Sequence, residues 1–251
     1  VRSVEGPEKT CLSRTAAAKG GVRDTEFRLA TLTDADAVLD GFTLAEAVPP
    51  AVDATAGLVR NCIATNFHKS FNQPLVRLSG TAVISNCVVD ATGAIFGDTQ
   101  ATVAMMSAGG SAQVLNCEFK NLAHTGNADN DWDRSGVILS GSAVLRNSFV
   151  HDVRFACNEE RAKRGLAGIY ATGDSKVDNC TVTRCWSKYH PGGGINVGEF
   201  YFTQTKNGLW NIQTLGNQYI GFDKEKRKIS LGYRRMEDNP WVKFVSNYGV
   251  G

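Results

Sequence analysis

The chain of 251 residues contains no apolar run of about eighteen residues, the length that a membrane-spanning helix needs. It also lacks the glycine-rich loop of nucleotide-binding proteins, the serine nucleophile elbow, a CxxC pair and the HExxH zinc motif. Its net charge of +2, from 27 basic and 25 acidic residues, is too small to indicate a nucleic-acid partner. These absences argue against a helical membrane protein, several common enzyme classes and a nucleic-acid-binding protein.

Proline is scarce and glycine is abundant, with six prolines against 26 glycines. Together with 42% hydrophobic and 9% aromatic residues, this composition is typical of a folded protein rich in turns. The chain begins with Val1 rather than methionine, and no charged-then-apolar signal segment follows it. We therefore expect the natural N-terminus to have been removed or left out.

The glycines belong to a repeating unit. In the segments 136–147 and 168–179, two glycines stand five residues apart, and an asparagine follows the second glycine after six residues. Gly80 and Gly110 precede Asn86 and Asn116 by the same six residues. A short module that recurs at intervals of about 20 to 50 residues predicts stacked units, each of which buries its apolar face only against its neighbours.

Each unit contains three short apolar segments, as at 137–139, 143–145 and 149–150, and no helical period. This pattern predicts an all-β solenoid of parallel strands with about six coils. The asparagines at 61, 86, 116, 147 and 179 are separated by 25, 30, 31 and 32 residues, and Asp40-Gly41 takes the equivalent place before them. We expect these asparagines to stack in one inward turn, about 4.8 Å apart, as a structural hydrogen-bonded ladder.

Four of the seven cysteines directly follow a ladder asparagine: Cys62, Cys87, Cys117 and Cys180, with Ser148 in the same slot. Stacked side chains point the same way in adjacent coils, which is poor geometry for disulfides, so we expect buried free thiols. Cys157 and Cys185 lie in neighbouring turns and could pair or remain free.

Several motifs carry a resemblance to a known group. They are the Asn-Cys pairs, the segment 119–121, the Gly192-Gly193-Gly194-Ile195 run, and the segments 1–10 and 37–44. Over roughly residues 1–198 they resemble bacterial right-handed parallel β-helix repeat proteins, which are pectin-lyase-like in fold, with repeats similar to those of polymorphic outer-membrane proteins. The resemblance implies a right-handed parallel β-helix and a secreted or bacterial cell-surface location. It does not imply one activity, because that fold carries both enzymes and non-catalytic surface domains.

Repeat length varies only between each asparagine and the next glycine, where the interval grows from 19 to 26 residues. Insertions at one corner of a solenoid project from one side, which is its default binding face. We expect loops at about 91–102, 121–135, 152–167 and 184–192, and a ligand on the side formed by the last three.

The first of these three loops contains alternating carboxylates, Asp129, Asp131 and Asp133, as in the first half of a calcium loop. Arg134 and Ser140 stand where an EF-hand has its glycine and its bidentate glutamate. The pattern therefore leaves two alternatives, a calcium site and a solvated loop tip.

The second loop carries a mixed charge run at 157–164, typical of a solvated turn, although Lys163 or Arg164 could instead neutralise an acidic sugar. The third contains side chains able to move a proton or stack on a ring. The candidate residues for catalysis are Lys163, Arg164, Lys188, Tyr189 and His190. The candidates for substrate binding are Asp131, Trp132, Arg134 and Arg161. We interpret His151, beside Val150, as packing at the edge of the core.

Residues 199–251 differ from the repeats, because ten of the 22 aromatic residues lie in them. The segments 217–222 and 227–233 predict a β-hairpin. We expect this C-terminal region to cap the open end of the solenoid, with a sugar-stacking or oligomer surface as the alternative.

Two functions fit these observations. One is an extracellular or cell-surface domain that binds a glycan, or another surface partner, through loops on one face. The other is a polysaccharide lyase that acts on an acidic polysaccharide, for which calcium or basic residues would neutralise the uronate and a nearby base would remove a proton. We favour the binding domain, because the sequence contains no complete acid-base set.

Overall fold

The computed structural model describes side chains for residues 1–13, 28–67, 73–96, 103–124, 135–155 and 168–186. It describes the backbone alone for strand residues 167, 187, 195–197, 200–204, 210–214, 218–223 and 228–231. These parts of the chain contain strands and turns but no helix, and so no helix long and apolar enough to cross a membrane.

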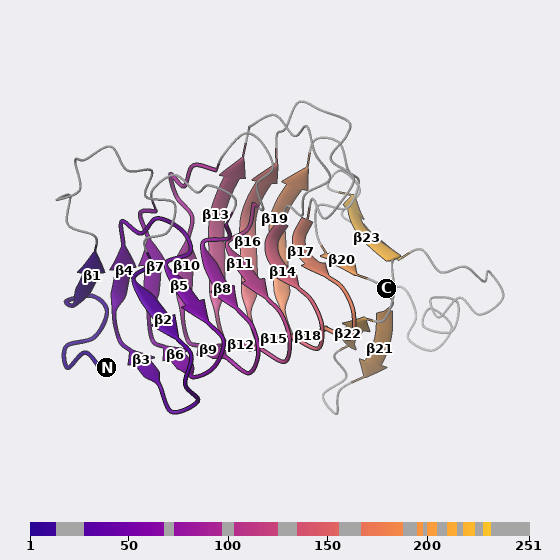
Figure 1. The fold of residues 1–251 in the computed structure, drawn as a ribbon. Coiled ribbons are helices and arrows are strands. Elements are labelled where there is room, and N and C mark those ends of the chain that lie inside the picture. The colour runs from indigo at the N-terminus through magenta and orange to yellow at the C-terminus, as the bar shows by residue number, and fades with distance from the viewer. Residues whose placement is uncertain are drawn as a thin grey trace.

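Parallel strands of three sheets make up the repeating part of the fold, and the chain visits these sheets in turn (Figure 1). The six-stranded sheet contains β3 (Val38–Asp40), β6 (Leu58–Arg60), β9 (Val83–Ser85), β12 (Gln113–Leu115), β15 (Val144–Arg146) and β18 (Lys176–Asp178). The seven-stranded sheet contains β1 (Cys11–Ser13), β4 (Thr43–Ala45), β7 (Ile63–Thr65), β10 (Val88–Asp90), β13 (Glu118–His124), β16 (Phe149–Phe155) and β19 (Thr181–Ser187).

The nine-stranded sheet begins with β2 (Ala30–Leu32), β5 (Val52–Ala54), β8 (Val76–Leu78), β11 (Met106–Ala108), β14 (Ser135–Leu139), β17 (Ala167–Ala171) and β20 (Ile195–Val197). It continues with β23 (Gln218–Asp223) and β24 (Lys228–Leu231), which pair antiparallel. These two strands form the hairpin that the sequence predicted. A second antiparallel pair is β21 (Phe200–Gln204) with β22 (Trp210–Thr214). The boundary at residue 198 and the capping role of the C-terminal region stay predictions.

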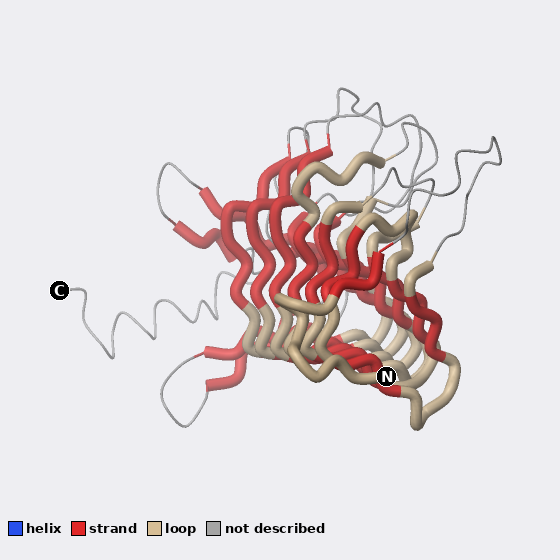
Figure 2. The backbone as a smooth tube through the Cα atoms, turned by 90° about the vertical axis from the view of Figure 1, so that its left-hand side faces the viewer, coloured by secondary structure: helices blue, strands red, loops and turns tan. Residues whose placement is uncertain are grey.

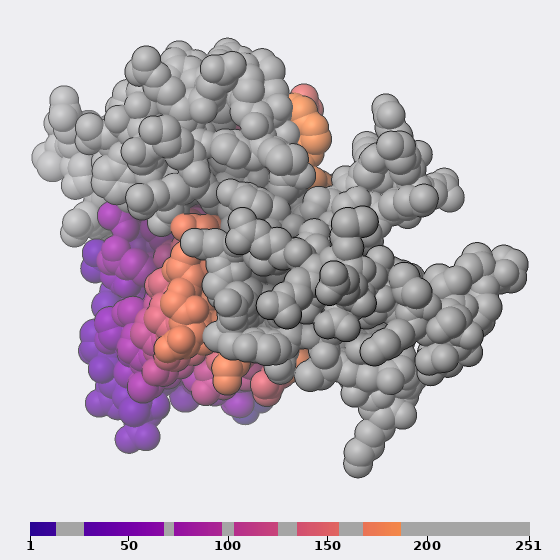
Figure 3. All heavy atoms as spheres, turned by 90° about the vertical axis from the view of Figure 1, so that its right-hand side faces the viewer, coloured from indigo at the N-terminus to yellow at the C-terminus, as the bar shows by residue number. Residues whose placement is uncertain are grey.

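Figure 2 shows the three sheets around a common interior, and the buried apolar residues from Leu32 to Val177 form one continuous cluster. Alternate strand residues point inward, so that Val114, Leu145 and Val177 come together from neighbouring strands. In the space-filling view the successive coils follow one another in colour order (Figure 3). A parallel β-solenoid with three strands per unit is therefore confirmed.

The turn between the six-stranded and seven-stranded sheets contains the asparagine column, but its side chains face outward. Asn86, Asn116, Asn147 and Asn179 are all exposed, and their φ angles lie between 49° and 54°. Asparagine is among the residues that tolerate this left-handed backbone best. The stacking is partly a side-chain ladder, since Asn179 Nδ2 donates to Asn147 Oδ1 at 2.8 Å. The predicted inward orientation is wrong, because these asparagines are exposed. Their recurrence is explained by the left-handed backbone of the turn, which asparagine adopts readily.

The predicted equivalence of Asp40 with the asparagines is also wrong by one residue. Asp40 pairs in register with Arg60, and Gly41, with a φ of 83°, takes the left-handed position of Asn61. Asp40 is instead a buried carboxylate that accepts hydrogen bonds from Asn61 Nδ2 at 2.8 Å and Arg60 Nε at 3.0 Å. These bonds, with that from Asn61 first, lower the pKa of Asp40.

Cys62, Cys87 and Cys117 of the cysteine column are buried inside the coils, as expected, whereas Cys180 is only partly buried. Cys62, Cys87 and Cys117 are each 3% exposed, and the Cys62 N–H lies 3.3 Å from Cys87 Sγ. All described cysteines, Cys185 among them, are free thiols, and Cys157 lies outside the described residues.

Candidate functional site

The seven-stranded sheet changes character at β13, β16 and β19, which have seven residues each where β1, β4, β7 and β10 have three. In the middle of each long strand one residue has a positive φ angle: Asn121 at 64°, Asp152 at 55° and Arg184 at 52°. The pairing register holds on both sides of these residues, so the three stack above one another at a shared bend. The sequence had predicted loops from 121, 152 and 184, and residues 121–124, 152–155 and 184–187 are strand instead.

A left-handed backbone suits asparagine and aspartate, whose short polar side chains bond locally, but it strains arginine. Such strain persists where the surroundings enforce it, and it gathers at functional sites. At Arg184 the surroundings include a two-pronged ion pair with Asp152: Nε lies 2.6 Å from Oδ1 and Nη2 lies 2.7 Å from Oδ2. The stacked bend residues Asn121, Asp152 and Arg184 therefore combine backbone strain with a strong ion pair.

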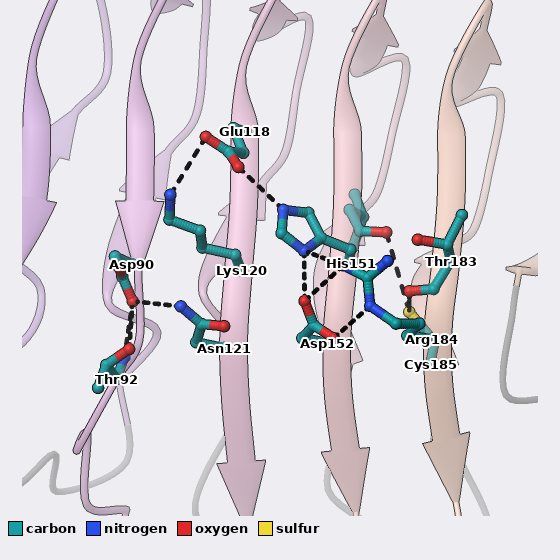
Figure 4. Close-up of polar contacts among 11 residues, drawn as sticks. Asp90, Thr92, Glu118, Lys120, Asn121, His151, Asp152, Thr183, Arg184 and Cys185 are labelled. Carbon is teal, nitrogen blue, oxygen red and sulfur yellow. Dashed lines mark hydrogen bonds and ion pairs between the residues drawn. The ribbon is translucent and has the colours of Figure 1, made fainter.

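This ion pair belongs to a chain of polar side chains that crosses the three strands (Figure 4). His151 lies in the middle, with Nδ1 2.6 Å from Asp152 Oδ2 and Nε2 2.9 Å from Glu118 Oε1. Glu118 extends the chain to Lys120, whose Nζ is 3.4 Å away. Asn121 is fixed from the other side, since its Nδ2 donates to Asp90 Oδ1 at 3.0 Å.

His151 is only 7% exposed, and its ring stacks on Phe149 with 4.1 Å between the ring centroids. Arg184 Nη2 also lies 3.0 Å from His151 Nδ1. Nδ1 thus lies between the Asp152 carboxylate and the Arg184 guanidinium, and Nε2 faces the Glu118 carboxylate. Both ring nitrogens are thus engaged, and His151 holds the two carboxylates in place.

The carboxylates respond to these partners. Hydrogen bonds from Arg184, and then from His151, hold the pKa of Asp152 far below its usual range. The hydrogen bond from His151 is the main cause of the lowered pKa of Glu118. Both groups are therefore ionised at neutral pH and act as fixed negative charges.

Beside this chain an open groove of about 580 Å³ runs over the three strands. Its lining residues are Asn121, Leu122, Ala123, Asp152, Arg154, Arg184 and Trp186. Trp186 is 46% exposed, which is unusual for so large an apolar side chain, and the guanidinium carbon of Arg154 lies 5.4 Å from the centroid of its ring. Within the described residues, the groove offers an aromatic face, two guanidinium groups, a carboxylate and an amide.

None of the residues that the sequence singled out can be placed in this groove. Lys163, Arg164, Lys188, Tyr189 and His190 lie outside the described residues, as do Trp132, Arg134 and Arg161. The same holds for Asp129, Asp131 and Asp133, and the described part of the chain contains no group of three His, Cys, Asp or Glu side chains arranged to hold a metal ion. These candidates and the calcium site stay predictions.

The sequence analysis missed the groove because it interpreted His151 as packing at the edge of the core and did not single out Asp152. A signal was present in the asparagine spacing. Glu118 and Phe149 each stand two residues after a column asparagine, and Arg154 and Trp186 each stand seven residues after one. Residues at equal offsets share a column, so this count predicts which side chains meet across strands.

The fold and the groove define the class of this molecule as a parallel β-solenoid with a polar, partly aromatic groove on one sheet. No family model matches the chain, and no solved structure matches it. One curated protein with a local likeness is the small ribosomal subunit protein bS1 of Pseudomonas aeruginosa, 29% identical over 83 residues. That alignment covers 31% of this chain and 15% of the relative, which is too little to assign a family.

Proposed function

We propose that this chain is a right-handed, pectin-lyase-like β-helix domain of about six coils that binds a glycan in the groove over β13, β16 and β19. Right-handedness is supported by the strong bias of parallel crossover connections and by the motifs of residues 1–198. The same resemblance supports a secreted or bacterial cell-surface location.

The observation that carries the proposal is the exposed face of Trp186 within an open groove of polar side chains. A sugar ring has apolar C–H faces and a rim of hydroxyl groups. An indole ring packs against the face, and the side chains of Asn121 and Arg154 supply hydrogen-bond donors and acceptors for the rim. The groove is open and spans three strands, which suits a chain of sugars better than a small buried ligand.

Binding of the whole chain to a panel of soluble neutral and acidic oligosaccharides, measured by calorimetry, tests this proposal. We expect Trp186→Ala to weaken binding about tenfold or more, because aromatic stacking at an exposed site contributes about 1 to 3 kcal/mol. Trp186→Phe keeps an aromatic face and should keep most of the affinity. If no glycan binds, or if the alanine variant binds as tightly as the parent, the proposal is wrong.

A polysaccharide lyase is the second candidate, favoured by the guanidinium group of Arg154 in the groove, which would neutralise a uronate carboxylate. The base would have to come from another residue, because His151 has both ring nitrogens engaged and Asp152 is held by Arg184. Lys188, Tyr189 and His190 are the candidates from the sequence. Incubation of uronate polymers with the protein, with and without a calcium chelator, tests for the unsaturated product of elimination.

A further inference from the structure

The charges that line the groove do not cancel. Arg184 and Asp152 neutralise one another through their two-pronged ion pair, because each group occupies the hydrogen-bonding edge of the other. Arg154 is the remaining charge in the lining, and it forms no ion pair with any described residue. The groove therefore presents one positive charge that no described carboxylate neutralises.

The position of Arg154 suits it to hold a ligand. Its guanidinium lies over the ring of Trp186, 5.4 Å from the centroid, and a stacked guanidinium keeps its in-plane N–H groups available as donors. Ala123, Arg154 and Trp186 occupy the same column on three neighbouring strands. Because Ala123 is small, the column leaves space beside Arg154 on the side away from Trp186.

We propose that the groove selects an anionic saccharide, with Arg154 bonding the carboxylate of a uronic acid while a sugar ring packs near Trp186. This inference rests on the proposed glycan-binding function and adds the chemical class of the ligand. A planar guanidinium donates two parallel hydrogen bonds to a planar carboxylate, a match that a neutral hydroxymethyl group does not offer. A sulfate ester has the same charge but a tetrahedral shape.

The test uses oligomers of a uronic acid and the same oligomers after chemical reduction of their carboxyl groups, with calorimetric titration of the whole chain. We expect the acidic oligomer to bind at least about tenfold more tightly than the reduced one, as a charge-assisted hydrogen-bond pair provides. Arg154→Gln should remove this preference, and Arg154→Lys should restore only part of it. Raising the salt concentration should weaken binding of the acidic oligomer more than that of the reduced one.

Arg146 provides a matched control, because it is an exposed arginine of β15 that pairs with Asp178 and does not line the groove. Arg146→Gln changes the net charge equally and should leave the preference unchanged. Thermal unfolding of each variant checks that Arg154→Gln, a change at an exposed position, leaves the fold intact.

The outcomes separate the two proposals. Equal binding of the acidic and reduced oligomers, with both weakened by Trp186→Ala, overturns the anionic class and leaves glycan binding standing. Equal binding of a sulfated, carboxyl-free oligomer overturns the choice of carboxylate. Absence of binding to every oligomer, or binding unaffected by Trp186→Ala, overturns the proposed function itself.

Discussion

At the scale of single residues, the glycine column depends on two physical constraints at once. Gly110 has a φ of 64°, where an alanine is strained, and an added Cβ would lie 2.8 Å from Gly80 N and 3.1 Å from Gly80 O. Coils stack at this turn by direct backbone contact, so the neighbour cannot move aside. We expect Gly110→Ala to lower the free energy of unfolding by about 2 to 4 kcal/mol, measured by denaturant titration.

Gly93 separates the two constraints, because its φ is 73° but an added Cβ would meet nothing within 4 Å. Gly93→Ala should therefore cost only the backbone strain, about 1 to 2 kcal/mol. Losses of equal size in the two variants would mean that the close approach of the coils contributes nothing.

The asparagine column leads to a different prediction from the one that a buried ladder makes. Asn147 is exposed with a φ of 51°, so its backbone conformation decides its cost of replacement. Asn147→Gly should change the free energy of unfolding by no more than about 0.5 kcal/mol, whereas Asn147→Leu should lower it by about 1 to 2 kcal/mol. Thermal or denaturant unfolding measures both, and a large loss in the glycine variant would restore the importance of the side-chain ladder.

At the scale of elements, strand order and strand count per unit were predictable, while the bends of β13, β16 and β19 were not. The apolar segments fixed which residues face the core, since Leu145 and Val150 point inward as their alternation requires. The bends were missed because Asn121 and Asp152 favour a left-handed backbone but Arg184, in the same column, does not. Backbone propensity alone does not place arginine in a left-handed conformation. The ion pair of Arg184 with Asp152 stabilises this conformation, and it is a tertiary contact that the local sequence does not reveal.

The hydrogen-bonded carboxylates of Glu118 and Asp152 at these bends make the stability of the fold depend on pH. The pKa of Asp152 is lowered in the folded protein, so the unfolded chain binds the proton more readily. The contribution of Asp152 to the free energy of unfolding is therefore present above the unfolded pKa, about 3.9, and is lost as the pH falls towards the folded pKa. Glu118, whose pKa is also lowered, acts in the same direction.

Asp152→Asn isolates this contribution, because asparagine accepts the φ of 55° but cannot ionise. We expect the parent to be more stable than the variant at pH 7 and the difference to shrink as the pH is lowered to 3. Denaturant unfolding at several pH values measures it. A difference that stays constant over this range would contradict the role of the charged Asp152.

At the scale of the whole molecule, the sequence predicted a solenoid whose ligand-binding side is the one where the repeats lengthen. The groove lies on the strands that precede the segments 125–134, 156–166 and 188–194, and the side of the array that a ligand contacts stays a prediction. The strands themselves carry the described lining, because pairing continues past the bends. Insertion length therefore predicts one side of the array, but it does not predict which side chains line the groove there.

A continuous core through all coils also predicts how the thiols react. Cys11 is exposed, whereas Cys62, Cys87 and Cys117 are 3% exposed, and burial raises the pKa of Cys117 to about 11. Cys180 and Cys185 are only partly buried, so the test uses a variant in which both of them and Cys157 are replaced by serine. A thiol reagent at pH 8 should label Cys11 of this variant quickly. Cys62, Cys87 and Cys117 should react only as the protein unfolds. Cys11→Ser should abolish the fast phase, and fast labelling that survives this change in native protein would contradict a core closed around Cys62, Cys87 and Cys117.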